Sequence, residues 1–585
     1  MSRESWVGIF LITLIMFLWT LWLAQSAQPG TPQKENPVPA DSVTKTASVA
    51  ESTLEETPDI GPYVRFMGLP ESTFTVQTPL YRAVFRTTGA ALKHLELTRH
   101  QDASGRLVTL WDERQKSEIT FAEGRYLIPL HRLSFEAIYL PRAPIEKSPD
   151  SAVFRLTLAK DTFIAIIYRF HPEDYHIERE VIFQNFKDRL RNPYLVHRVM
   201  LETPQTERSA KLMRPYTALY YRQGEEVDYL QPEEEEKIEK TLQGNIYWVS
   251  AKGHFFAQLF RSDAGYSAVT LKSLPFGEEE LPKYEVLLQV PIEDGRTRES
   301  LYLGPLRYTY LKKYGRDYEK QLNLGWSFIR YINTGFIIPV FQTLEKYVPS
   351  YGIIIAILAL LVKIILSPLT WQSYLAGARM QVINELPEVK ALDEKYRDDP
   401  NKLMMEKSLL YRELGVNPLS GCIPLLLQMP LFFAMVSFFP SAFELRQRSF
   451  LWAQDLSTYD DLIRWGFHIP ILGDHISLFA LMTALTTLAY TLLSPQSSST
   501  TPGMKWLPYL TPVIFFLFLN SYSAALSWYY TVLNVLTIAQ TLIMRRMVDK
   551  EAIIRKLRQR RQKRSNAGVM RQSVPRWLRQ AGKRR

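Results

Sequence analysis

Long apolar runs and strongly charged stretches alternate along the chain, and apolar runs dominate its second half. The run from Gly352 to Thr370 reads GIIIAILALLVKIILSPLT and is long enough to cross the hydrocarbon core of a bilayer as a helix. Similar blocks follow at 423–439 and 476–493. A block from 506 to 544 is too long for one helix and divides at the polar residues 520–523. The pattern predicts a helical transmembrane bundle whose core, residues 351–547, has five spans.

A further span is expected at the N-terminus, because Trp6 to Leu23 is apolar and has tryptophans at both ends, as in an aromatic belt. The alternative is a cleaved signal peptide. A long apolar part and an N-terminal region with Arg3 alone favour a retained anchor over residues 1–24. Residues 25–62 are rich in Pro, Ser, Thr and Glu and predict a flexible linker.

Residues 63–320 change to short runs of β-type residues separated by turn signals. In one run, Tyr81, Ala83 and Phe85 share one face of a strand while Arg82 and Arg86 lie on the other. The runs favour an all-β sandwich domain without catalytic residues. They are Tyr81–Arg86, Val153–Leu158, Phe163–Phe170, Ile177–Phe183, His254–Phe260 and Tyr284–Val290.

Two shorter segments flank the first span of the core. Residues 321–350 mix apolar, aromatic and basic positions and predict an amphipathic helix in the membrane interface. Residues 374–416 are charged and break at Asp398-Asp399-Pro400-Asn401, a helix stop followed by a cap and a proline at the first helical position. This second segment predicts an antiparallel helical hairpin in water.

The charge pattern gives a topology. With six spans in total, the ends of the chain lie on the same side, and the loop from Arg379 to Arg412 carries many basic residues. The positive-inside rule places that loop and both termini in the cytoplasm. The β domain then lies outside, where its own charges do not count because long domains translocate regardless.

The net charge of +11 is concentrated in the C-terminal tail, residues 548–585. Such a tail binds anionic lipid, and its length makes RNA a second plausible partner. Its candidate contact residues include Arg555, Lys556, Arg558, Arg560, Arg561, Lys563 and Arg564.

Lys363 is the one charged residue within the span at 352–370. An ammonium at that depth costs about 2.5–3.5 kcal/mol on insertion scales, so it indicates a functional position. The alternative is snorkelling, but the inner end of the span is about 10 Å away and a lysine stem reaches about 6 Å. A cation that faces a wet cavity between helices is therefore the favoured interpretation.

Enzyme and metal motifs are absent from the sequence. The single cysteine, Cys422, lies in an apolar run, and the nine histidines show no metal-ligand spacing. Zinc-protease, nucleophile-elbow, phosphate-loop and dinucleotide fingerprints do not occur. We expect no catalytic residue, metal or cofactor.

The run Asn417–Phe432, NPLSGCIPLLLQMPLF, closely resembles the signature of the YidC family of membrane-protein insertases. SPLT at 367–370, the charged hairpin and Trp528-Tyr529-Tyr530 agree with that family. WVSAKGHFFAQLF at 248–260 is similar to the large periplasmic domain of its Gram-negative members. The resemblance covers nearly the whole chain and implies a multi-pass protein of the bacterial inner membrane.

The resemblance implies a substrate groove formed by Lys363, Gln428, Tyr530 and Asn534. It also implies nascent membrane proteins as clients, with the Sec translocon and the ribosome as further partners. The family usually has an arginine where this chain has Lys363. Lysine keeps the charge but loses the planar fork, so any bidentate contact is in doubt.

Three other function classes fit the sequence less well. A secondary transporter predicts internal repeats and intramembrane acids, but the core spans contain neither. An intramembrane enzyme needs a paired acid, a Ser/His pair or a metal set, none of which occurs. A simple anchor for the β domain does not require Lys363 or five further helices.

Overall fold

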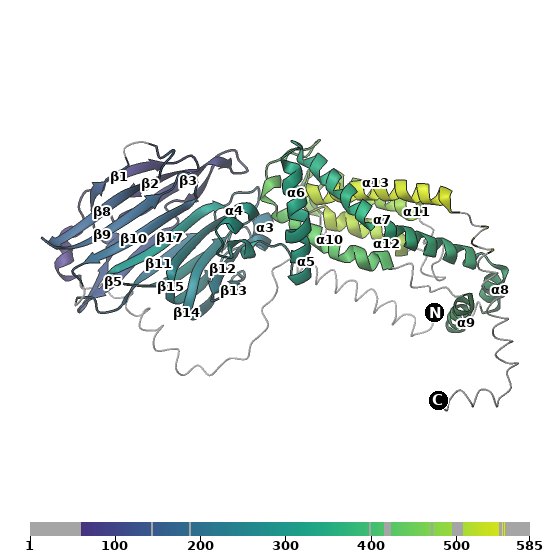
Figure 1. Cartoon of the computed structure of the whole chain (residues 1–585), viewed down its shortest axis with the longest axis horizontal. Coiled ribbons are helices and arrows are strands. Elements are labelled where there is room, and N and C mark those ends of the chain that lie inside the picture. Colours follow the sequence, from purple (N-terminus) through teal and green to yellow (C-terminus); the bar gives the residue numbers. More distant parts are fainter. Residues whose placement is uncertain are drawn as a thin grey trace, which may run out of the picture. The chain divides into compact units, whose positions relative to one another are not determined.

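The computed structural model of the protein describes residues 60–141, 144–186, 189–396, 399–414, 423–469, 472–493, 507–548, 551, 553 and 555 (Figure 1). They form two compact units that divide between Asn323 and Leu324. The predicted first span, residues 25–59 of the predicted linker and all of the tail except residues 548, 551, 553 and 555 lie outside the described residues.

The first unit consists of antiparallel strands in a 4-stranded and a 13-stranded sheet. The smaller sheet has the order β1-β2-β3-β4, and the larger one runs β6-β5-β11-β16-β15-β17-β10-β9-β8-β7, with β12, β13 and β14 attached to it through β15. The strands are β1 (Thr73–Gln77), β2 (Tyr81–Arg86), β3 (Ala91–Gln101), β4 (Leu107–Trp111), β5 (Lys116–Glu123), β6 (Tyr126–Pro129), β7 (Glu136–Tyr139), β8 (Asp150–Ala159), β9 (Thr162–Phe170), β10 (His176–Gln184), β11 (Tyr194–Glu202), β12 (Ala218–Gln223), β13 (Glu226–Leu230), β14 (Ile238–Lys252), β15 (Phe256–Leu274), β16 (Lys283–Pro291) and β17 (Arg296–Pro305).

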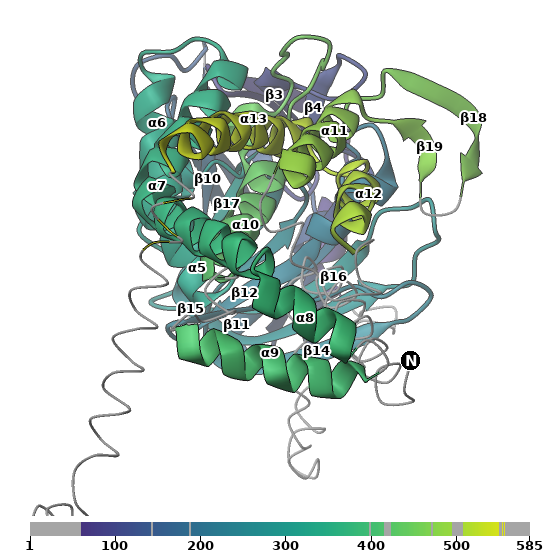
Figure 2. The same cartoon turned by 90° about the vertical axis from the view of Figure 1, so that its right-hand side faces the viewer.

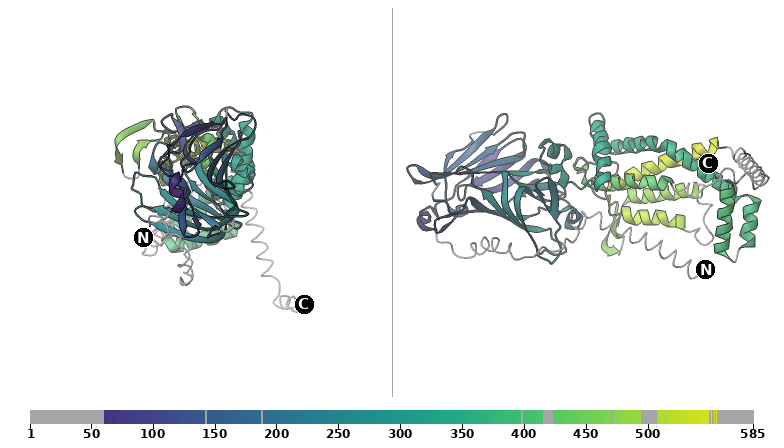
Figure 3. Two further views of the ribbon diagram at one scale, coloured as in Figure 1. Left: turned by 90° about the vertical axis from the view of Figure 1, so that its left-hand side faces the viewer. Right: turned by 60° about the horizontal axis from the view of Figure 1, so that its bottom comes forward.

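The all-β class is confirmed, but the strands do not form a sandwich of two comparable sheets. They form a large half-barrel with a small additional sheet (Figure 3). The reason is that β14 and β15, with 15 and 19 residues, pair with several neighbours and keep the strands in one continuous sheet. Short helical elements complete the unit: η1 (Gly61–Phe66), η2 (Leu130–Arg132), α3 (Ala210–Met213), η3 (Arg214–Tyr216), α4 (Tyr308–Lys313) and η4 (Tyr318–Gln321).

Side-chain alternation in the strands produces the core of this unit. Tyr81, Ala83 and Phe85 are fully buried on one face of β2, while Arg82 is exposed on the other. The predicted strand at 254–260 is wrong at its start, because β15 begins at Phe256. Residues 253–255 instead form the turn from β14, where Gly253 N–H donates to the carbonyl of Phe256.

The second unit is mainly helical. Its elements are α5 (Ser327–Ile332), the π-helical turn η5 (Asn333–Ile337), α6 (Ile338–Glu345), α7 (Tyr351–Asn384), α8 (Pro387–Lys395), α9 (Pro400–Leu414), α10 (Ile423–Ser441), η7 (Phe443–Leu445), β18 (Ile463–Ile469), β19 (Gly473–Ile476), α11 (Leu478–Leu493), α12 (Leu507–Leu519) and α13 (Ala524–Met547). The apolar blocks of the sequence thus become α7, α10, α11, α12 and α13.

Among the described residues, α7 alone is both long and apolar enough to cross a membrane by itself, and α11 and α12 are shorter apolar helices. Helix α13 packs against α7 and α11, and α12 packs against α11. At one end of the bundle, Trp528 Nε1 donates a 2.9 Å hydrogen bond to the carbonyl of Gly352. This contact shows that α7 and α13 begin at the same level.

The helical hairpin predicted at 374–416 is present as α8 and α9, which lie side by side (Figure 2). The turn falls at Asp399-Pro400 as expected, and Lys407 Nζ lies 2.6 Å from Asp393 Oδ1 across it. Its start differs from the prediction, because α7 continues to Asn384. The segment at 321–350 is helical, as predicted, over α5, η5 and α6.

Candidate functional site

Lys363 on α7 reaches across to α13, where its Nζ atom donates a 2.9 Å hydrogen bond to Thr537 Oγ1. Lys363 lies about 18 Å from the start of α7, and Thr537 lies about 20 Å from the start of α13, at 1.5 Å per residue. The lysine side chain is half-buried. Its neighbours Ile364 and Ile365 are 58% and 60% exposed, as lipid-facing side chains are. The lysine is therefore directed toward the helix interface.

A second polar contact joins the same two helices about one turn farther along α13. Gln540 Nε2 on α13 donates a 2.9 Å hydrogen bond to Thr370 Oγ1 on α7. Gln540 lies three residues after Thr537, so both side chains project from one side of α13. Two successive turns of α13 thus present polar groups to α7.

Asn534 points from α13 to the other neighbour, α11. Its Nδ2 atom lies 2.8 Å from Thr487 Oγ1 and 3.2 Å from Thr486 Oγ1. Nearer the start of α13, the buried hydroxyls of Thr483 and Thr531 lie 2.9 Å apart. We call the residues of these contacts the polar track: Lys363, Thr370, Thr483, Thr486, Thr487, Thr531, Asn534, Thr537 and Gln540.

Tyr530 belongs to an aromatic cluster nearer the start of α13. Its ring lies 5.7 Å from Phe432 of α10 and 6.0 Å from Phe515 of α12, measured between centroids. Phe518 of α12 lies 6.2 Å from Phe432. The Tyr530 hydroxyl is buried without a hydrogen-bond partner among the described residues. The cluster joins α10, α12 and α13 by contacts between aromatic rings.

Gln428 is half-buried on α10, one turn before Phe432. The structure assigns its amide no hydrogen bond within the described part of the chain. Of the four groove residues predicted from the sequence, Lys363 and Asn534 therefore lie in the polar track, on different sides of α13. Tyr530 lies in the aromatic cluster, and Gln428 is near that cluster on α10.

Sequence reasoning missed Thr370, Thr537 and Gln540. The available signal was the spacing of polar residues in α13, which recur every three positions at 531, 534, 537 and 540 within an apolar helix. That spacing marks a polar stripe that winds around the helix. It does not tell which neighbouring helix each residue contacts.

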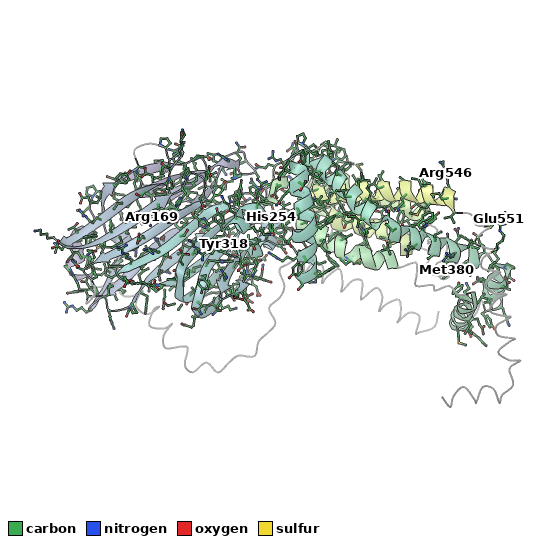
Figure 4. The ribbon with its side chains drawn as sticks, viewed as in Figure 1. Arg169, His254, Tyr318, Met380, Arg546 and Glu551 are labelled. Atoms are coloured by element: carbon green, nitrogen blue, oxygen red, sulfur yellow. The ribbon has the colours of Figure 1, made fainter. Side chains whose placement is uncertain are left out.

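The described basic residues at the far end of α13 are Arg545 and Arg546, both exposed in its last turn (Figure 4). The tail residues predicted to bind ribosome or lipid lie outside the described residues, except for Arg555. That residue is exposed and helical. Positive charge is thus present at the end of the bundle opposite to the aromatic cluster.

The β domain contains a buried charged cluster of Arg179, His197 and Glu299. Arg179 forms an ion pair with Glu299, and His197 Nδ1 lies 3.1 Å from Glu299 Oε1. Burial alone would raise the pKa of the Glu299 carboxyl, but the adjacent Arg179 and His197 lower that pKa to about 2. Burial lowers the pKa of His197, in opposition to the effect of Glu299.

These three groups resemble acid–base machinery, but no substrate has room beside them. The adjoining cavity of about 30 Å³ accommodates about one or two water molecules. His197 is fully buried, and Glu299 is 6% exposed. The cluster is therefore a structural part of the β domain. Among the described residues, no group of His, Cys, Asp and Glu is arranged to hold a metal ion.

Comparison with known proteins covers both units. The family model described as "YidC periplasmic domain" matches residues 73–335, and the model described as "60Kd inner membrane protein" matches residues 343–551. The membrane protein insertase YidC of Amoebophilus asiaticus (strain 5a2) is 31% identical over 586 residues, which cover 97% of this chain and 96% of the relative. The membrane protein insertase YidC of Prosthecochloris aestuarii (strain DSM 271 / SK 413) is 31% identical over 568 residues, which cover 92% of this chain and 94% of the relative.

Among solved structures, an active YidC insertase with its first transmembrane domain resolved is similar to this chain at 18% sequence identity. The alignment covers 85% of this chain and 97% of the other, with a TM-score of 0.32.

Proposed function

The chain belongs to the YidC family of membrane protein insertases, and we propose that its polar track is the path along which polar segments of client proteins enter the membrane. As a family member it is an inner-membrane protein with a periplasmic domain, and its substrates are nascent membrane proteins. It is an insertase and not an enzyme. The proposal concerns how this chain performs insertion.

The hydrogen bond between Lys363 and Thr537 carries the proposal. A lysine that only snorkels extends along its own helix toward the nearer headgroups, whereas this one contacts the neighbouring helix at the same depth. Gln540 of α13 and Thr370 of α7 form a second polar contact between the same two helices, and Asn534 presents its amide to α11. Polar groups are costly in hydrocarbon, so their concentration where α13 packs against α7 and α11 supports a function for them.

The track lowers the cost of the difficult step of insertion. A translocating segment brings polar groups into hydrocarbon, where each unpaired group costs several kcal/mol. Hydroxyl and amide side chains offer such a segment temporary partners, and the Lys363 ammonium attracts acidic groups. The apolar span of the client then moves into lipid, driven by hydrophobic transfer. No covalent step or nucleotide is required.

The orientation of the chain in the membrane determines which partners each end can contact. We propose six segments, at residues 1–24, 25–62, 63–320, 321–350, 351–547 and 548–585. One span lies in 1–24 and five lie in 351–547, and both termini are in the cytoplasm. Exposed Arg545 and Arg546 at the end of α13 support this orientation. The basic tail then faces the ribosome and anionic lipids, and the Sec translocon is a further proposed partner.

Photocrosslinking tests the path directly. A photoreactive amino acid replaces Lys363 or, as the matched control, Ile365, which is 60% exposed on the same helix. Ribosome-bound clients are arrested with a hydrophilic segment in transit. We expect crosslinks to that segment from position 363 and few from 365. Equal crosslinking from both positions, or none from 363, would contradict the proposed path while leaving the family assignment unaffected.

A further inference from the structure

The β-hairpin formed by β18 and β19 carries exposed apolar side chains. Leu462, Ile463 and Phe467 are 57%, 56% and 66% exposed. The ring of Trp465 lies 6.3 Å from that of Phe467, measured between centroids. We call Leu462, Ile463, Trp465 and Phe467 the hairpin patch. Large apolar side chains grouped in this way on a short hairpin mark a contact surface.

Polar contacts on the same hairpin keep its shape. Arg464 Nε lies 3.3 Å from Asp474 Oδ2 on the partner strand, and Arg464 also donates to the Tyr459 hydroxyl at 3.2 Å. The indole of Trp465 donates a 3.3 Å hydrogen bond to the carbonyl of Gly473. The hairpin thus combines a charged cross-strand pair with an uncovered apolar patch, which makes it amphipathic.

Strand β19 and the turn before it are fixed to the ends of the helices. Asn520, at the turn between α12 and α13, donates 2.9 Å hydrogen bonds from Nδ2 to the carbonyls of Leu472 and His475. The His475 ring stacks on Tyr459 with 3.7 Å between centroids. Only Ser477 separates β19 from the start of α11. The hairpin is therefore held at the level where α11 begins.

The hairpin extends sideways from this level. Figure 2 shows β18 and β19 reaching beyond α11 and α12 and not covering the end of the bundle. On α11 itself, Leu485 and Leu492 are 57% and 61% exposed, as expected of side chains that face lipid tails. A structure that projects laterally from the end of a spanning helix meets the headgroup region of the bilayer.

We propose that the hairpin patch inserts into the headgroup region of the periplasmic leaflet and anchors the outer ends of α11 and α12 there. Tryptophan and phenylalanine are the residues that favour this depth. Arg464, Asp461 and Asp474 remain on the side of lipid phosphates and water. The inference rests on the proposed placement of α11 in the membrane and adds a lipid contact outside the polar track.

Quenching of a fluorescent probe by lipids tests this contact. The full-length protein with Cys422→Ser, in liposomes without other proteins, receives a single cysteine by Phe467→Cys, Arg464→Cys or Leu485→Cys. Each is labelled with an environment-sensitive dye. Lipids with a nitroxide near the headgroup should remove about half of the fluorescence at 467 and much less at 464. Position 485 should respond to a nitroxide deep in the acyl chain.

The three labelled positions separate the hypothesis that the hairpin patch anchors in lipid from the hypothesis that α11 lies in the membrane. Quenching at 485 without quenching at 467 overturns the hairpin anchor and leaves the placement of α11 intact, whereas no quenching at either position contradicts both. A dye at 467 that is shielded from water but not quenched by lipid indicates a protein contact and also overturns the anchor. A photoreactive residue at 467 in the chain with its natural cysteine should crosslink to phospholipid, which checks the result independently of Cys422→Ser.

Discussion

The Lys363 ammonium on α7 and the Thr537 hydroxyl on α13 are joined by a 2.9 Å hydrogen bond. The charged group therefore lies between two apolar helices, about 18 Å from the start of α7 at 1.5 Å per residue. This placement means that a substitution at 363 changes the electrostatics of the helix interface. A snorkelling lysine would instead affect contacts with headgroups.

Substitution of Lys363 should affect clients according to their charge. Lys363→Arg should preserve insertion because the charge is kept. Lys363→Ala should reduce insertion several-fold for a client with an acidic translocated segment and less for a neutral one, and Lys363→Glu should be worst because it repels acidic segments. Insertion is measured in cells depleted of the wild-type protein. Near-normal insertion of both clients by the Ala variant would refute a role for the charge.

Thr537→Val provides the matched control for Lys363. The substitution keeps the shape of the side chain and removes the acceptor, so the ammonium loses its hydrogen bond but keeps its charge. We expect a small effect on insertion that does not depend on client charge. A defect in Thr537→Val as large and as client-specific as that of Lys363→Ala would show that the position of the ammonium matters more than its charge.

Asn534 should contribute mainly to the packing of α11 against α13. Its amide donates to the hydroxyls of Thr486 and Thr487, and interhelical hydrogen bonds in membranes are worth about 0.6 kcal/mol on average, with a maximum near 1.7. Asn534→Leu should lower the unfolding free energy in detergent by about that amount. Asn534→Leu in a Thr486→Val/Thr487→Val background should cost less, which identifies the contact. An equal loss of unfolding free energy in both backgrounds would show that the contact of Asn534 with Thr486 and Thr487 does not stabilise the protein.

Gly352, near the start of α7, leaves room for the ring of Phe450, which lies in the loop between η7 and β18. A Cβ atom at this position would lie 2.1 Å from the ring of Phe450, which also packs against Trp528 with 5.2 Å between centroids. Gly352→Ala should lower the free energy of unfolding by about 1–3 kcal/mol, the usual cost of overpacking. Phe450→Leu should recover part of the loss. Full stability of Gly352→Ala alone would contradict this packing.

Hydrophobic patterning predicted the apolar helices and several strands because burial has the period of the local structure. The run Tyr81–Arg86 coincides with β2, since alternate side chains must be either buried or exposed. Strand order was not predictable in this way. Strand β10 pairs with β17, so that His176 lies opposite Tyr302, and alternation in each strand carries no information on its partner.

The polar track was only partly predictable for a different reason. Lys363 stands out because a charge in an apolar run is costly. Thr537 does not, because its hydroxyl also donates a 2.6 Å hydrogen bond to the carbonyl of Leu533 in its own helix. A threonine whose hydroxyl bonds to its own helix carries little energetic cost in an apolar helix, so the sequence does not distinguish a threonine that also contacts another helix.

The continuation of α7 to Asn384 was missed because the hairpin was expected to begin at residue 374, within the last turns of α7.

The basic tail should bind ribosomes through phosphate contacts. Deletion of residues 551–585 should abolish most co-sedimentation with ribosomes, and binding by the full chain should weaken steeply as salt rises from 50 to 200 mM. A tail with the same residues in scrambled order should bind similarly, because neutralisation of phosphates does not depend on sequence. Unchanged co-sedimentation after the deletion would remove the tail from the ribosome contact.

The buried charged cluster should make the stability of the β domain depend on Glu299. Glu299→Gln leaves Arg179 buried without its counter-charge, a change that typically costs about 3–5 kcal/mol. Glu118→Gln is the control. Its carboxylate pairs with Arg198 at 3.6 Å on a partly exposed surface, where a pair is worth at most about 1 kcal/mol. Amide hydrogen exchange in β10 and β17 of the full-length protein measures both effects.

The pH dependence tests the charge of Glu299 separately from its shape. Its folded-state pKa is about 2, below the ordinary 4.5, so its contribution is present in full above 4.5 and is lost as the pH falls through 2. The difference in stability between wild type and Glu299→Gln should therefore be constant from pH 7 to pH 5. At pH 3.5 it should be smaller by about 1 kcal/mol, since a protonated glutamate is equivalent to glutamine in charge. If the difference is the same at pH 3.5 as at pH 7, Glu299 stabilises the domain through packing and neutral hydrogen bonds, and the ion pair with Arg179 contributes no net stability.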